Sequence, residues 1–198
     1  MAIKSLQHSS LTDNVFYRSM LAGNEAFDDS SDFLLEEVVL PSSAASVTFS
    51  DLGAYASEYQ HLQIRAAVRT DRAATSDDVT VTINSITNSY AYHTLLGNGS
   101  TVISGEDSPS KPYMRIFHGA SGATATANAF GAFVMDILDF SSSSKNTTIR
   151  ALAGSSSTAV SLNSGLTNNT AAVTSITLDQ VSGSNFISGS RFSLYGSK

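Results

Sequence analysis

The longest apolar run of the chain, residues 129–140, constrains the fold more than any other stretch. Both residue parities are apolar, with Phe130, Ala132, Val134 and Leu138 on one and Phe133, Met135 and Ile137 on the other. Such a run is typical of a buried strand or a buried helix segment. Its flanks favour the strand, because polar and small residues precede it and four serines follow it, and neither flank caps a long helix well. We therefore expect a central strand that is covered on both faces.

Shorter stretches on either side alternate as strands do. Leu62, Ile64, Ala66 and Val68 alternate with residues that we expect to point outward. Further strands are expected at residues 33–40, 47–49, 79–83, 90–96, 114–118, 147–152, 160–162, 172–178 and 191–195. We expect the threonines of 79–83 to face solvent, Phe192 and Leu194 to lie in the core, and residues 70–78 and 104–112 to be connections. About ten short strands without a long helix predict an all-β fold, an antiparallel, jelly-roll-like β-sandwich over residues 33–198.

Residues 1–32 have a different pattern. Their apolar residues do not follow a strand period, and an acidic, serine-containing hinge at 28–32 closes the segment. An apolar segment outside a β domain needs a surface to cover it, which is either its own domain or a neighbouring subunit. On the second alternative the segment is an extended docking arm, and its candidate docking residues are Val15, Phe16, Met20, Leu21 and Phe27.

Composition excludes several classes of partner and chemistry. The net charge is −6 and the 11 Lys and Arg residues are scattered, so we expect no nucleic-acid partner. Cysteine is absent, which rules out a disulfide, a thiolate metal site and a cysteine nucleophile. No run reaches transmembrane length and the N-terminus lacks a signal-peptide pattern, so we expect no membrane partner and assembly in a cytoplasm.

Catalytic and metal-binding motifs are not recognisable. His8, His61, His93 and His118 stand singly, and we expect each to be a surface or hydrogen-bonded structural residue. Neither a Gly-x-Ser-x-Gly motif nor a calcium-loop pattern occurs. We therefore predict no catalytic residues, no metal and no cofactor, and hence a protein that is not an enzyme.

Two sets of residues keep alternatives open. The carboxylates Asp136 and Asp139 would matter to a glycosidase only if two such groups faced each other across a cleft. We expect Asp136 to pair instead with Arg69 or Arg150. Four tyrosines, Tyr55, Tyr59, Tyr90 and Tyr92, form either an aromatic platform for a sugar or a half-buried edge of the core.

Several segments together resemble a family of small virion proteins from tailed bacteriophages, marine and cyanobacterial phages especially. The segments are residues 20–27, 59–65 followed by 69–78, 121–140, and 189–196. The resemblance covers most of the chain from about residue 20, and it brings no catalytic residues with it. It implies a location in the virion, but it does not specify whether the protein belongs to the head, the tail or a fibre.

From these observations we expect a capsid cement or decoration protein. It would strengthen the head lattice through its arm and an oligomeric sandwich, with the major capsid protein as partner and a homotrimer as its assembly. The alternative is a tail-fibre or baseplate protein whose sandwich binds a host surface glycan. An enzyme that degrades host polysaccharide is the third and weakest class.

Overall fold

The computed structural model describes residues 32–155 and 159–198, apart from the side chains of 107–109. The chain divides into two units, Met1–Phe33 and Leu34–Lys198, and the second unit holds the sandwich from Leu34 onward. The five predicted docking residues, Val15, Phe16, Met20, Leu21 and Phe27, lie outside the described residues. Their role therefore stays a prediction.

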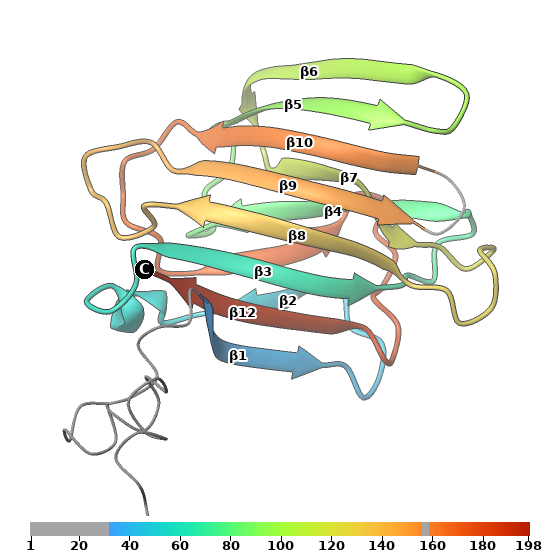
Figure 1. Cartoon of the computed structure of the whole chain (residues 1–198), viewed down its shortest axis with the longest axis horizontal. Helices are drawn as coiled ribbons and strands as arrows, with labels where there is room; N and C mark the ends of the chain where they lie inside the picture. Colours follow the sequence, from blue (N-terminus) through green and yellow to red (C-terminus); the bar gives the residue numbers. More distant parts are fainter. Residues whose placement is uncertain (1–31, 156–158) are drawn as a thin grey trace, which may run out of the picture. The chain divides into compact units, whose positions relative to one another are not determined.

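The described residues form two antiparallel sheets that pack against each other (Figure 1). The larger sheet has eight strands in the order β1-β12-β3-β8-β9-β10-β5-β6. Its strands are β1 (Asp32–Val39), β12 (Arg191–Ser197), β3 (His61–Val68), β8 (Gly131–Leu138), β9 (Thr148–Ser155), β10 (Ala159–Thr167), β5 (Tyr90–Gly97) and β6 (Val102–Lys111). The smaller sheet has the order β2-β11-β4-β7 and consists of β2 (Val47–Phe49), β11 (Ile176–Gln180), β4 (Ser76–Ile83) and β7 (Met114–Ser121). A single 3-10 turn, Leu52–Tyr55, is the only helical element among the described residues, so the predicted all-β sandwich is confirmed.

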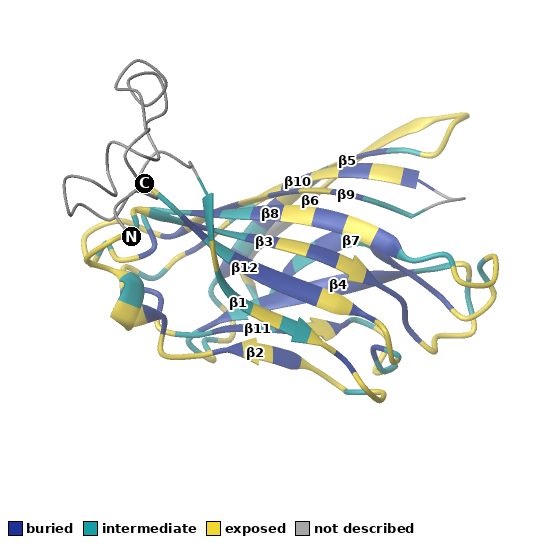
Figure 2. Cartoon of the chain, turned by 60° about the horizontal axis from the view of Figure 1, so that its bottom comes forward, coloured by how far each residue is buried: buried dark blue, intermediate teal, exposed yellow. Residues whose placement is uncertain are grey.

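The core lies between the two sheets, where most strands other than the edge strands β1 and β6 bury residues against the opposite sheet (Figure 2). On β3 the buried residues are Leu62, Ile64, Ala66 and Val68, as the alternation predicts. The C-terminal strand is also anchored as predicted, since Phe192 and Leu194 are fully buried. The Phe192 ring meets that of Phe186 edge-on, with the ring centroids 5.0 Å apart.

Three of the sequence-based expectations about connections and threonines are wrong. Residues 104–112 are not a loop, because β6 runs through them as an edge strand. Residues 70–78 are not wholly a linker, because β4 begins at Ser76 and Asp77 is fully buried. Thr80 does not face solvent, since it is buried in the smaller sheet. Asp77 tolerates burial because it accepts hydrogen bonds from the hydroxyls of Thr70, Ser182 and Ser184 at 2.7–3.1 Å and from Arg72 at 3.2 Å.

The expectation of a central strand covered on both faces is wrong for the described chain. β8 does lie inside the larger sheet, between β3 and β9. Phe133, Met135 and Ile137 are buried against the smaller sheet, but Ala132 and Val134 on the other parity are exposed. The smaller sheet covers only one side of β8, and no described element covers the other (Figure 2).

Candidate functional site: the outer face of the larger sheet

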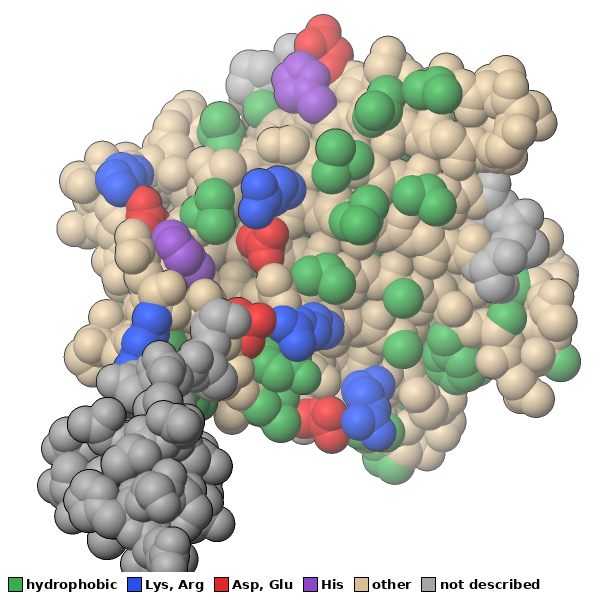
Figure 3. Space-filling model, viewed as in Figure 1, with side chains coloured by type: hydrophobic (Ala, Val, Ile, Leu, Met, Phe, Trp, Pro, Cys, Tyr) green, Lys and Arg blue, Asp and Glu red, His purple; other side chains and the backbone are tan. Residues whose placement is uncertain are grey.

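The outer face is defined here as the side of the larger sheet that points away from the smaller one. Strands β8, β9 and β10 alternate strictly between buried and exposed residues along most of their length. In a soluble antiparallel sheet the exposed parity is usually polar. On this face it is largely apolar, as the hydrophobic side chains gathered over the middle and upper strands show (Figure 3).

The apolar residues of this face form two adjacent rows that cross the strands in register. We call the two rows the apolar band. The first row is Val134–Leu152–Leu162–Leu95, and the second is Ala67–Ala132–Gly154–Val160–Gly97–Val102. Cross-strand neighbours stand about 4.5–5.5 Å apart, so each row is a continuous strip of contacts. The large side chains of the band are substantially exposed, from 40% for Val134 to 73% for Val102.

A polar row runs beside the band, one pleat further along the strands. It consists of Gln63–Asp136–Arg150–Ser164–His93–Glu106. The Asp136 carboxylate accepts hydrogen bonds from Gln63 Nε2 at 2.8 Å and from Arg150 at 3.0 Å. The predicted ion pair of Asp136 is therefore confirmed with Arg150. The other candidate, Arg69, is buried elsewhere and donates to backbone carbonyls of residues 123–129.

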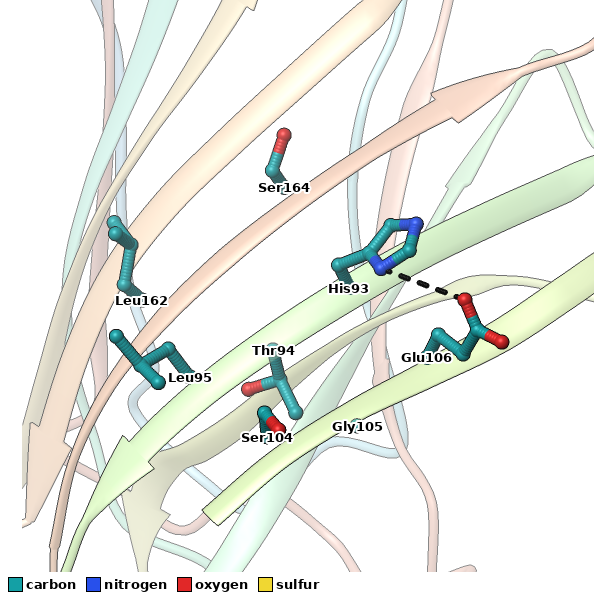
Figure 4. A pocket seen from close by; sticks show the side chains of 8 residues that line it. All are labelled: His93, Thr94, Leu95, Ser104, Gly105, Glu106, Leu162 and Ser164. Atoms are coloured by element: carbon teal, nitrogen blue, oxygen red, sulfur yellow. Dashed lines mark ion pairs between the residues drawn. The ribbon is translucent and has the colours of Figure 1, made fainter. Parts of the chain in front are cut away.

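An open hollow of about 600 Å³ lies where the polar row meets the band on β5, β6 and β10. His93 and Glu106 line it together with Leu95 and Leu162, and the imidazole Nδ1 is 3.9 Å from the Glu106 carboxylate (Figure 4). Both side chains are more than 70% exposed, and the Ser164 hydroxyl points away from the imidazole. The His93–Glu106 separation is longer than the hydrogen bond of about 2.6–3.2 Å that orients a catalytic base, so we describe the two residues as an exposed ion pair.

His61 has a structural hydrogen-bond partner, and the described residues contain no group of side chains that could hold a metal ion. His61 Nδ1 accepts a hydrogen bond from the backbone N–H of Asp139 at 3.0 Å, in the hydrogen-bonded structural role expected for it. Across residues 32–155 and 159–198, no three His, Asp or Glu side chains gather in a way that could hold a metal ion. The same residues include no helix long and apolar enough to cross a membrane.

Two of the four tyrosines considered for a sugar platform, Tyr90 and Tyr92, do not contribute to one. Tyr90 and Tyr92 are buried and belong to the core, so they present no ring to a sugar. The backbone N–H of Ile83 donates to the Tyr90 hydroxyl at 2.6 Å, and burial raises the pKa of that hydroxyl above its ordinary value. The core alternative is therefore confirmed for these two residues.

The fold and this face define a class of protein, which is an all-β antiparallel sandwich with one open, largely apolar sheet face. No protein-family model and no curated protein matches the chain. Among solved structures, the alginate lyase Aly36B is similar at a TM-score of 0.28 and 6% identity, covering 93% of this chain and 91% of that one. A likeness this slight neither establishes an enzymatic activity nor argues against one.

Proposed function

We propose that this protein is a structural protein of a tailed-bacteriophage virion that acts by adhesion between subunits, as a capsid cement or decoration protein. The apolar band is the observation that carries the proposal. Contiguous apolar patches larger than a few hundred Å² are rare on monomeric soluble domains and mark contacts with other proteins. A broad, flat band on a rigid sheet suits a module that acts by burying surface between subunits, those of its own kind included.

The composition and the family resemblance support the same proposal. A cysteine-free chain with few charges gains its stability from packing and from contacts with neighbours. The segments that resemble phage virion proteins include the strand β8, which contributes Ala132 and Val134 to the band. The major capsid protein is the proposed partner, the virion is the proposed location, and the homotrimer stays a prediction.

A second candidate is a tail-fibre or baseplate protein that binds a host glycan. The hollow beside His93 and Glu106 favours it, because a few polar groups next to apolar side chains, here Leu95 and Leu162, are typical of small-molecule sites in general. A glycan array distinguishes this candidate, since a decoration protein is expected to give no saccharide-dependent signal on it.

The decisive experiment is binding to particles of the phage that encodes the chain, prepared without this protein. We expect the full chain to co-sediment with these heads at a copy number comparable to that of the capsid subunits. A variant without residues 1–27 is expected to fold and to lose binding, because the proposed arm residues lie in that segment. Labelling confined to tails, or no binding of the full chain, would contradict the decoration role; binding by the truncated chain would show that the arm is not the anchor.

A further inference from the structure

We infer that the outer face of the larger sheet pairs with the same face of a second copy of this chain. The pairing would be two-fold, about an axis that lies parallel to the strands between β9 and β10. This inference rests on the proposed adhesive function, and it names what covers the band. It is carried by the rows across the sheet, which turn out to be self-complementary under that rotation.

Under this rotation β9 of one copy faces β10 of the other, β8 faces β5, and β3 faces β6. Each row of residues across the sheet then faces the same row of the second copy. In the first row of the band, Leu152 would face Leu162 of the second copy, and Val134 would face its Leu95. All four side chains are exposed and apolar, so the pairing removes both partners of each contact from water.

The second row complements itself in shape. Here Val160 would face Gly154 of the second copy, and Val102 would face its Ala67, so a projecting side chain meets a small residue each time. Val160 and Val102 are 60% and 73% exposed. A hollow of about 590 Å³ lies over Ala67, Ala132 and Gly154, in the half of the face that the partner's valines would cover.

The polar row complements itself in charge. Asp136 would face His93 of the second copy, Gln63 would face its Glu106, and Arg150 would face its Ser164. No like charges are brought together, which is the arrangement that fixes the register of an interface. An axis parallel to the strands keeps the facing strands aligned, inside the range of about 30° within which packed sheets keep their strand directions.

The size of the face also fits a dimer. Six strands at about 4.8 Å spacing, each about eight residues long at about 3.4 Å per residue, span about 29 by 27 Å, or about 780 Å². A standard stable interface buries about 800 Å² on each partner. The projected face is therefore about as large as one side of a standard interface.

The first test is the mass of the full chain in solution, measured by sedimentation across a dilution series. We expect an even-numbered species, which is a dimer alone or a hexamer if the predicted trimer also forms. Val102→Glu on the outer face is expected to halve the mass. The matched control is Ile103→Glu, on the same strand with 52% exposure but pointing to the opposite side, and it is expected to leave the mass unchanged.

The second test addresses the two-fold geometry itself. Leu152→Glu and Leu162→Lys are each expected to halve the mass, because each places two charges in the band. Mixing the two variants is expected to restore pairing, since one Glu then faces one Lys while the second contact remains Leu on Leu. A mixture of Leu152→Glu with Leu152→Lys is the control, and it is expected to recover far less. Circular dichroism of each variant serves as the check that it is folded.

Several outcomes would overturn the inference. They are a monomeric or purely trimeric full chain, a mass that survives Leu152→Glu and Leu162→Lys, and pairing that depends on residues 1–31 instead of the band. These results are separable from the proposed function. A dimer that binds no particle would refute the decoration role alone, whereas a monomer that still decorates particles would refute the two-fold pairing alone.

Discussion

Arg69 holds the loop between β7 and β8 in place, and its removal is the most informative test of what stabilises the domain. The residue follows β3 and is 8% exposed. Its guanidinium donates four hydrogen bonds to backbone carbonyls, to Thr126 at 2.8 Å, Ala129 at 2.7 Å, and Ala123 and Ala125 at 3.1 Å. The planar fork of arginine matches this set of carbonyls in a way that lysine cannot.

The expected cost of Arg69→Met follows from these four bonds. A hydrogen bond to a charged group contributes about 1.5–3 kcal/mol, so four would sum to about 6–12 kcal/mol. That sum is an upper bound, because most residues of 123–128 are exposed and their carbonyls can bond water instead. We expect a loss of about 2–4 kcal/mol in the free energy of unfolding, or about 4–16 °C in Tm for a domain of this size.

Urea denaturation and native-state hydrogen exchange measure this directly. We expect Arg69→Met to lower the urea midpoint and to accelerate exchange in residues 122–131, with Arg69→Lys intermediate. Arg191→Met is the control, because it removes an exposed ion pair with Glu37 and should cost under about 1 kcal/mol. If Arg69→Met unfolds at the same urea concentration as the control and exchange in the loop is unchanged, the loop does not depend on this guanidinium.

Two further predictions concern single positions. A Cβ on Gly122 would lie 2.1 Å from the carbonyl oxygen of Ala74, so Gly122→Ala should cost about 3 kcal/mol or more in urea denaturation. Gly53→Ala, with open space around the added methyl, should be near neutral, and equal costs for the two would contradict the steric reasoning. A hydrogen bond from Lys145 is the main cause that lowers the pKa of the Asp139 carboxyl, so its contribution to stability is present above the unfolded-state pKa of about 3.9 and lost as the pH falls through the folded value. The stability difference between the native chain and Asp139→Asn should therefore shrink below about pH 4, and a constant difference down to pH 2 would refute this.

The sequence predicts those parts of the fold in which the residue pattern of a single strand shows which side of that strand is buried. The alternation of His61–Val68 identifies both the strand and its buried side, since a two-residue period requires only one covered face. The edge strand β6 gives no such signal. Serine, glycine and proline dominate residues 104–112, and an edge strand tolerates them because one of its sides pairs with no other described strand.

The candidate site, the apolar band, could not be predicted from any single stretch of the sequence. Each of Val134, Leu152, Leu162 and Leu95 is an ordinary apolar residue in its own strand. They become one row only through the registers of three strand pairs, and these registers depend on the packing of the whole sheet. The buried Asp77 was missed for a related reason, because two of the hydroxyls that satisfy it, those of Ser182 and Ser184, lie more than 100 residues away in the chain.

The apolar run at 129–140 bears on two points, which are the wrong prediction of a strand covered on both faces and the inference that two copies pair. A strand with both parities apolar is expected where both sheet faces are covered, yet the described chain covers only Phe133, Met135 and Ile137 of β8. The uncovered parity carries Ala132 and Val134, and both belong to the apolar band. In the two-fold pair Val134 would be covered by Leu95 of the second copy, so β8 would then be buried on both sides. The composition of this strand is therefore better explained by an assembled pair than by a single chain, and solvent exposure of Val134 in the native assembly would remove that explanation.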